Sequence, residues 1–408
     1  MRVDIDKIYN MIVEADRVLE GKVYRTPVDK SHALSRLTGG EVYLKLENLQ
    51  RTGAFKIRGA YYTLWRTIRE GRVRTCVTAS SGNHAQGVAL AASELGVRAI
   101  IVMPETTPRI KVKATRDYGA EVVLHGRTYD DAYERALKIR EELGAEFVHP
   151  FNDERVVAGQ GTIGLEICRA LGRVDVVLVP VGGGGLISGI AIAMKRLVPK
   201  AKVIGVQPEG APAMTLSYRE GRLVEYSDVD TIADGVVVKR PGDLTLSIIR
   251  ELVDDMVLVS DDDIIRAMLL LLERSKCVAE PAGALGVAAL LSGKVDVSGK
   301  RAVVVVSGGN VDMTLLARVI EKALVLEGRQ VRVVGVVPDV PGTLKEVLDV
   351  IADLGANVVD IRHDRADPSL RPGKARVAIT MELPEGVSAG DVVERLRERG
   401  YAFEPVWA

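Results

Sequence analysis

Residues 176–194 read VVLVPVGGGGLISGIAIAM, and this charge-free stretch decides how the surrounding chain folds. Its length would suit a membrane helix, but Pro180 and the glycines at 182–185 would break an isolated one. The stretch is therefore predicted to form a buried strand, a glycine loop and a buried helix. A strand that is apolar throughout is covered on both faces, which is typical of a parallel sheet in an α/β protein.

Short apolar runs alternate with longer amphipathic runs on both sides of this stretch. Helices are expected between the strands, for example at 85–95, 128–143, 186–197, 260–275 and 282–291. The expected strands are 41–46, 75–78, 99–102, 121–124, 175–181, 202–207, 256–259 and 302–307. These are too many for one sheet of usual size, so two α/β lobes are predicted. Ligands of such sheets bind at the carboxyl ends of the strands.

The tail has a different order of elements. A strand is expected at 331–337, a helix at 342–354, strands at 358–362 and 376–382, a helix at 388–399 and a short strand near 403–406. This β-α-β-β-α-β order predicts an α+β ferredoxin-like unit, with a loop-like insert at 364–374. The boundary is placed between residues 328 and 329, which gives regions 1–328 and 329–408.

Composition excludes several classes of protein. The chain has 408 residues, with 55 Lys and Arg balanced by 55 Asp and Glu, so nothing marks it as a nucleic-acid binder. Its three cysteines are scattered and support neither a disulfide framework nor a zinc site. The first residues carry charges where a signal peptide needs an apolar core. A soluble, cytoplasmic protein is expected.

Lys56 lies in the run TGAFKIRGA at residues 52–60. The apolar neighbours Phe55 and Ile57 leave the Lys56 amine poorly hydrated, and this desolvation favours the neutral form of the amine. A neutral lysine amine is what a Schiff base with an aldehyde requires. The alternative is an ordinary lysine whose charge reaches solvent from an amphipathic helix.

Two loops that each precede an expected helix suit anions. The loop SSGNHAQG at 80–87 offers hydroxyls and backbone N–H groups to a carboxylate, and the Asn83 amide can bond a ring hydroxyl; a plain helix cap is the alternative. The glycines at 182–185 let the backbone wrap a phosphate. A dinucleotide loop is disfavoured because Ile187 and Ser188 break the required glycine spacing.

A fourth loop, Ser307–Asn310, follows the apolar strand at 302–306. A serine hydroxyl at that strand's end could bond a ring nitrogen, although a simple turn capped by Asn310 is an equal alternative. One cofactor has an aldehyde for Lys56, a phosphate for the glycine loop and ring polar groups for Asn83 and Ser307. That cofactor is pyridoxal 5′-phosphate.

These motifs resemble those of fold-type II (tryptophan synthase β-like) pyridoxal-phosphate enzymes, and specifically threonine ammonia-lyases with a C-terminal ACT regulatory domain. The resemblance covers about residues 10–325 and then the tail. It rests on residues 53–60, 80–87, 182–186, 232–235, 239–242, 280–283 and 307–310, and in the tail on 339–344 with 357–358.

The resemblance implies a role for each matching residue. Lys56 would hold the cofactor covalently and transfer the substrate α-proton, with Ser81 as the catalytic group on the opposite face. The implied cofactor contacts are Phe55, Lys56, Asn83, Gly182, Gly183, Gly184, Gly185, Leu186, Gly235 and Ser307. The implied substrate contacts are Ser80, Ser81, Gly82, Asn83 and His84. Gly342 and Asn357 would bind a regulatory amino acid, isoleucine or valine, in a homodimer or homotetramer; a ferredoxin-like unit used only for oligomerisation is the alternative.

The implied activity is that of a carbon–nitrogen lyase of isoleucine biosynthesis, which converts L-threonine to 2-oxobutanoate and ammonia and L-serine to pyruvate. Serine racemisation or serine dehydration on the same scaffold is the alternative activity. Threonine synthesis on this scaffold and a non-enzymatic amino-acid sensor are two further alternatives. Racemases of this kind bind a divalent metal through acidic residues, and the matching positions here are Gln207 and Ala213. No metal is therefore expected. Ser307, unlike an aspartate, does not favour a charged ring nitrogen, which should favour elimination.

Overall fold

The computed structural model describes residues 3–71 and 74–406, which form two compact units, Met1–Val311 and Asp312–Ala408. Helix α13 (Met313–Leu326) belongs to the second unit by this division, whereas the boundary expected at 328 lies after that helix. In the described part of the chain, no helix is long and apolar enough to cross a membrane.

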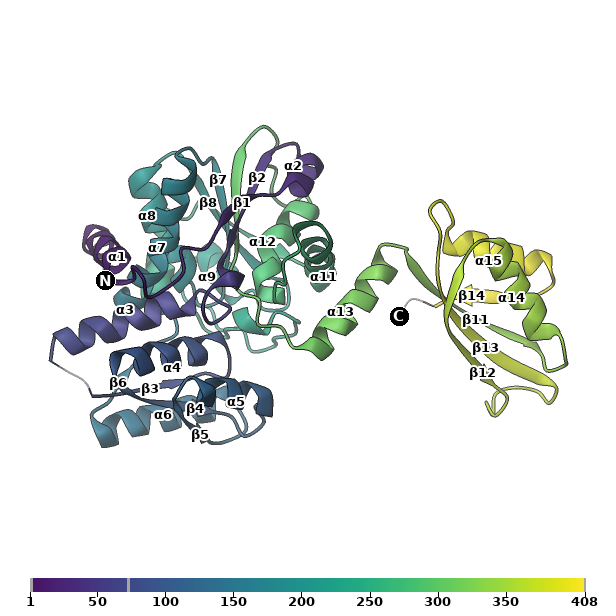
Figure 1. The fold of residues 1–408 in the computed structure, drawn as a ribbon, viewed down its shortest axis with the longest axis horizontal. Helices are drawn as coiled ribbons and strands as arrows, with labels where there is room; N and C mark the ends of the chain where they lie inside the picture. Colours follow the sequence, from purple (N-terminus) through teal and green to yellow (C-terminus); the bar gives the residue numbers. More distant parts are fainter. Residues whose placement is uncertain (1–2, 72–73, 407–408) are drawn as a thin grey trace. The chain divides into compact units, whose positions relative to one another are not determined.

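The first unit contains two sheets, as expected from the alternating pattern (Figure 1). The larger sheet has the order β1 (Val28–Lys30), β2 (Glu41–Leu46), β10 (Arg301–Val306), β7 (Val176–Pro180), β8 (Lys202–Pro208) and β9 (Asp255–Val259). All neighbours are parallel except β1 and β2. The carboxyl ends of β7 and β10 therefore meet at one edge of the sheet, where the glycine loop and Ser307 follow them.

The smaller sheet has the order β5 (Glu121–Leu124), β4 (Arg98–Met103), β3 (Thr75–Ala79) and β6 (Glu146–Phe147), all parallel. Alternate residues of its strands face opposite sides. Cys76 and Ile101 pack with helix α4 (Asn83–Leu95), and Val77 and Ile100 pack with helix α6 (Tyr129–Leu143). A sheet with helices on both faces explains the nearly continuous apolar strands.

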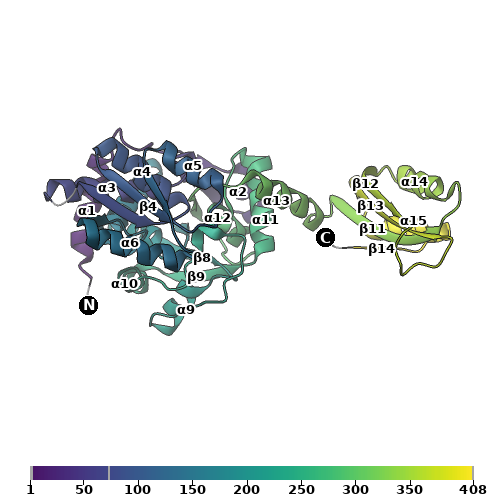
Figure 2. The same ribbon diagram turned by 90° about the horizontal axis from the view of Figure 1, so that it is seen from below.

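Helices surround both sheets of this unit (Figure 2). They are α1 (Ile5–Val18), α2 (His32–Thr38), α3 (Lys56–Arg69), α4 (Asn83–Leu95), α5 (Arg109–Asp117), α6 (Tyr129–Leu143), α7 (Glu154–Leu171), α8 (Gly185–Leu197), α9 (Ala213–Glu220), α10 (Asp243–Leu252), α11 (Asp261–Leu270) and α12 (Pro281–Leu291). The helix expected at 260–275 is corrected: α11 ends at Leu270, and a π-helical turn, Leu271–Ser275, follows. Short 3-10 turns lie at Glu47–Leu49 and Asp234–Val236.

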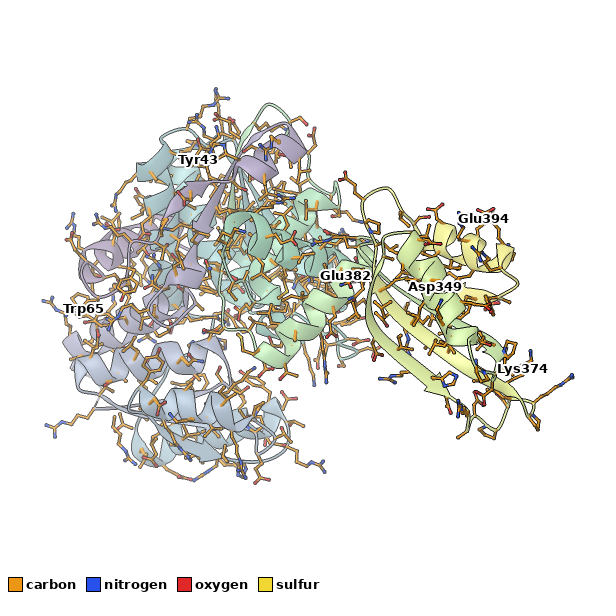
Figure 3. All side chains as sticks on the ribbon, turned by 45° about the vertical axis from the view of Figure 1, so that its right-hand side comes forward. Tyr43, Trp65, Asp349, Lys374, Glu382 and Glu394 are labelled. Atoms are coloured by element: carbon orange, nitrogen blue, oxygen red, sulfur yellow. The ribbon has the colours of Figure 1, made fainter. Side chains whose placement is uncertain are left out.

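The second unit confirms the ferredoxin-like order. After α13 it contains β11 (Gln330–Pro338), α14 (Thr343–Asp353), β12 (Asn357–Asp364), β13 (Lys374–Glu382), α15 (Ala389–Glu398) and β14 (Phe403–Pro405). Its antiparallel sheet has the order β12, β13, β11, β14. Apolar residues of α14 and α15 pack on this sheet, while charged residues such as Asp349 and Glu394, labelled in Figure 3, are exposed.

Candidate active site

Backbone hydrogen bonds join the Lys56 segment to the end of β10. Phe55 N–H donates to the Ser307 carbonyl (3.2 Å), and Gly309 N–H donates to the Gly53 carbonyl (2.9 Å). An isolated β-bridge connects Ala54 to Gly308 between them. The structure therefore places Lys56, at the start of α3, beside Ser307, although 250 residues separate them in the sequence.

The Lys56 amine lies in a poorly hydrated place. Its Nζ donates to the Pro150 carbonyl (2.8 Å) and lies 5.2 Å from the centre of the Phe55 ring. Burial lowers the pKa of Lys56 to about 8, against a smaller opposing effect of the Glu280 carboxyl. A fraction of the amine is therefore neutral near physiological pH, and a neutral amine is nucleophilic.

The glycine loop lies next to the residue that follows Pro150. A Cβ added to Gly183 would lie 2.3 Å from the Phe151 ring, and one added to Gly184, whose φ is +91°, would lie 2.7 Å from Met214 Cε. Only glycine fits at these two positions, so the loop keeps its backbone bare at the N-terminus of α8. The segment Pro150–Phe151 thus connects Lys56 to the loop predicted to hold the phosphate.

Asn83 begins α4, and both ends of its side-chain amide are hydrogen-bonded. Its Nδ2 donates to Glu280 Oε1 (2.7 Å), and its Oδ1 accepts from Asn310 Nδ2 (2.8 Å). Asn310 Nδ2 also donates to the Thr52 carbonyl (2.7 Å), just before the Lys56 run. Asn83 therefore belongs to the same site as Lys56 and Ser307.

Glu280 has an unusual environment for a carboxyl group. It is 5% exposed, and burial raises its pKa to about 7, against the lowering effect of its hydrogen bond from Asn83. Its Oε1 lies 2.3 Å from the position of a Cβ added to Gly308 and 3.7 Å from that of one added to Gly235. Gly235, predicted to pass near the cofactor ring, is thereby placed beside the Asn83 amide.

The remaining predicted substrate residues surround the start of α4. Ser80 Oγ accepts from Gly82 N–H (3.3 Å), and Gly82 has open space where a Cβ would lie. Ser81 is partly exposed beside them. His84, by contrast, is buried with its Nε2 2.9 Å from the Val148 carbonyl, and burial lowers its pKa to about 3. Its ring is therefore neutral and is held against the backbone.

Sequence reasoning missed two parts of this site. The Pro150–Phe151 segment carries no local signal, because its contribution is a carbonyl and a packed ring. Glu280 lies in the recognised motif Glu280–Gly283, but no role was predicted for it. Its signal was a carboxyl group at the start of an otherwise apolar helix, since residues 281–291 carry no charge.

Two further places bear on the predictions: Gln207, where no metal was expected, and the regulatory site expected at Gly342 and Asn357. Gln207 is buried, and its Oε1 accepts from Thr215 N–H (2.7 Å) and Thr215 Oγ1 (2.9 Å). Within residues 3–71 and 74–406, no three His, Cys, Asp or Glu side chains cluster as metal ligands would. In the second unit, Gly342 (φ +98°) precedes α14, and Asn357 Nδ2 donates to Glu382 Oε2 (3.3 Å).

The site residues fit pyridoxal phosphate. The bare glycine loop at a helix N-terminus suits its phosphate, and the amine of Lys56 suits its aldehyde. The Asn83 nitrogen retains a hydrogen for a ring oxygen, and Ser307 ends the neighbouring strand. No group in the site conflicts with this assignment in the described part of the chain.

Comparisons with known proteins agree with this geometry. A model of the family "Pyridoxal-phosphate dependent enzyme" matches residues 19–308, and a model of the ACT domain matches residues 332–400. The chain is 50% identical over 390 residues to an L-threonine ammonia-lyase of Thermotoga maritima, which covers 96% of this chain and 97% of that protein.

Solved structures resemble most of this chain as well. The processed form of threonine deaminase isoform 2 from Solanum lycopersicum has a TM-score of 0.75 and 41% identity, over 78% of this chain and 89% of that one. Maize serine racemase has a TM-score of 0.73 and 36% identity, over 80% of this chain and 99% of that one. The chain therefore belongs to the pyridoxal-phosphate dependent enzymes, as a member of the threonine ammonia-lyase family that carries a C-terminal ACT domain.

Proposed function

We propose that this protein deaminates L-threonine to 2-oxobutanoate and ammonia, and L-serine to pyruvate. The observation that carries the proposal is the lowered pKa of Lys56, about 8, in a site that also contains a bare glycine loop, Asn83 and Ser307. The similarity to an L-threonine ammonia-lyase extends through the tail, which supports the same activity for the whole chain.

The residues of the site divide the chemistry among them. Bound pyridoxal phosphate supplies electron withdrawal from the α-carbon of the amino acid. The Lys56 amine would hold the cofactor covalently, and its neutral form would take the α-proton of the substrate. The N-terminus of α4 with Ser81 binds the substrate carboxylate, and the glycine loop binds the phosphate.

Ser307 affects which reaction follows proton removal. A serine hydroxyl at the ring nitrogen, unlike a carboxylate, does not favour a charged pyridinium. Negative charge on the α-carbon would then be weakly stabilised, which would favour prompt loss of the β-hydroxyl over transamination.

The test is the release of 2-oxo acid from L-threonine and L-serine by the protein saturated with pyridoxal phosphate. The Lys56→Met variant should bind the cofactor without a covalent link and release no ammonia. Formation of D-serine from L-serine, measured by chiral separation, reports racemase activity. The Ser81→Ala variant then shows whether any such activity depends on Ser81. If the protein forms D-serine faster than 2-oxo acid from either substrate, the lyase proposal is wrong.

We also propose that residues 1–328 form the catalytic region and residues 329–408 a regulatory one that binds isoleucine or valine near Gly342 and Asn357. A matching ACT domain supports this division. Threonine kinetics should respond to one of these amino acids in the natural protein and lose the response in Asn357→Ala. A cytoplasmic homo-oligomer acting in isoleucine biosynthesis remains a prediction from the resemblance.

A further inference from the structure

The amide of Asn83 can be oriented in two ways, and the surrounding contacts select one of them. The chain of hydrogen bonds begins at the Thr52 carbonyl, which can only accept. Asn310 must therefore direct its Nδ2 there, and the same nitrogen donates to Asn83 Oδ1. This leaves Asn83 Nδ2 facing Glu280 Oε1, which accepts at 2.7 Å.

Glu280 is not explained by a structural role. It occupies the N-cap position of α12, but its side chain makes no capping hydrogen bond. Its carboxyl is 5% exposed and has no ion pair within residues 3–71 and 74–406, although Lys56 and Lys111 act on it at longer range and Asp234 opposes them. Burying a carboxyl group without an ion pair is costly. The buried Glu47, in comparison, is neutralised by Arg58 at 2.8 Å. A buried carboxyl that contacts an active-site amide instead of a cation points to a function.

An asparagine nitrogen carries two hydrogens, and Glu280 accepts one of them. The second has no acceptor among residues 3–71 and 74–406, and Asn83 is partly exposed beside Lys56 and Ser307. The amide oxygen is already occupied by Asn310. Asn83 is thus held with its oxygen toward Asn310 and its nitrogen, a donor only, toward Glu280 and a ligand on that side.

We propose that Glu280 and Asn310 are positioning residues that lock the Asn83 amide with its nitrogen toward the cofactor, so that the site binds pyridoxal phosphate with its ring hydroxyl ionised. An N–H donor stabilises an oxyanion more strongly than a neutral hydroxyl, whose own proton would then face an amide nitrogen that cannot accept it. This inference rests on the proposed contact between Asn83 and the cofactor ring and adds which charge state of that ring the chain selects.

The experiment measures two properties of the cofactor bound to the full-length protein. The first is its dissociation constant, from titration of dialysed protein with pyridoxal phosphate. The second is the pH at which its absorption changes from the ionised to the neutral ring hydroxyl. The variants are Glu280→Ala, Asn83→Ala and the double variant, with Glu280→Gln as the matched control that keeps an accepting oxygen.

Glu280→Ala should weaken cofactor binding and lower the ratio of ionised to neutral hydroxyl by about tenfold to a hundredfold, as expected for a hydrogen bond to a charged atom. Glu280→Gln should change both by less than about threefold, because its oxygen still accepts. The double variant should match Asn83→Ala, because Glu280 acts through Asn83. Asn310→Ala, which frees the other end of the amide, should shift the absorption in the same direction.

Two results would overturn the inference. One is a Glu280→Ala protein with unchanged absorption and affinity; the other is a double variant in which the two effects simply add. If Glu280→Ala does not fold, Asn310→Ala decides by the same criteria. Failure of the natural protein to bind pyridoxal phosphate would instead refute the proposed function itself.

Discussion

Replacing Lys56 with methionine tests whether burial lowers the pKa of this amine. Methionine has a similar length and no charge, so it removes the ammonium group while filling the same space. The side chain lies at the start of α3, and its Nζ has the Pro150 carbonyl as its hydrogen-bond acceptor. The cofactor-free variant should unfold at higher denaturant concentration than the natural protein at pH 7.

The magnitude follows from the pKa of Lys56, which is about 8 in the folded protein against an ordinary value of 10.5. Below pH 8 the amine is protonated in both states, and its burial destabilises the folded protein by about 3 kcal/mol. Methionine removes this cost but loses the hydrogen bond to Pro150, worth about 1 kcal/mol. The net gain is therefore about 2 kcal/mol at pH 7.

The sign of the effect depends on pH. Between pH 8 and 10.5 the folded amine is increasingly neutral while the unfolded amine keeps its proton, so the cost falls; above 10.5 it is absent. The stability gained by the methionine variant should shrink over this pH window. Above it, the variant should be less stable than the natural protein by about 1 kcal/mol, the contribution of the lost hydrogen bond.

The assay is urea unfolding of cofactor-free protein at several pH values, followed by the fluorescence of Trp65. Trp65 lies on the same helix as Lys56 and is labelled in Figure 3. The chain has two tryptophans, so a Trp407→Phe background isolates this signal. Lys113→Met on α5, whose side chain is 75% exposed, controls for the loss of a surface charge. A stability difference that is the same at every pH would refute the reasoning.

Three further predictions concern other parts of the site. Arg58→Met leaves the buried Glu47 without its guanidinium partner and should lower the free energy of unfolding by about 3–5 kcal/mol, measured by urea unfolding. Gly183→Ala places a Cβ 2.3 Å from the Phe151 ring, and equilibrium dialysis should show cofactor affinity at least about tenfold weaker. Dialysis against a chelator, and then addition of Mg²⁺, should leave threonine deamination unchanged, because Gln207 stands where the racemases have an acidic metal ligand, and its buried amide oxygen is already hydrogen-bonded.

The strongly periodic parts of the sequence could be interpreted without a structure. The strands around β7 and β10 are apolar at nearly every position, and this signal is local and strong. The tail alternates clearly, as in β13, where buried and partly exposed residues follow one another. The short strands β1 and β6 were not predicted, because they have three and two residues, too few for a period.

The contacts that complete the site could not be predicted, because they depend on tertiary packing. Asn83 and Glu280 are 197 residues apart, and the local sequence around each is explained equally well by a helix cap. The π-helical turn at Leu271–Ser275 was likewise missed, since its residues continue the helical pattern. It ends at Lys276, whose φ of +54° is unusual for a residue with a Cβ.

The first turn of α3 carries two cations in opposite situations. Arg58 is fully buried, and its guanidinium donates to Glu47 (2.8 Å) and Glu166 (2.7 Å), which raise its pKa. Lys56, two residues earlier, has a carbonyl instead of a carboxylate for its Nζ, and its pKa falls to about 8.

The ion pairs of Arg58 bear on how the partly buried Lys56 keeps its amine away from water. Because Glu47 and Glu166 belong to separate elements, the ion pairs of Arg58 fix the start of α3 and prevent Lys56 from turning toward water. A loosened first turn would let the amine hydrate, and its pKa would rise toward 10.5. Arg58→Met should therefore shift the pH dependence of amine labelling at Lys56 upward, even where the variant remains folded. An unchanged labelling profile would show that burial of Lys56 is set by the contacts around Pro150 alone.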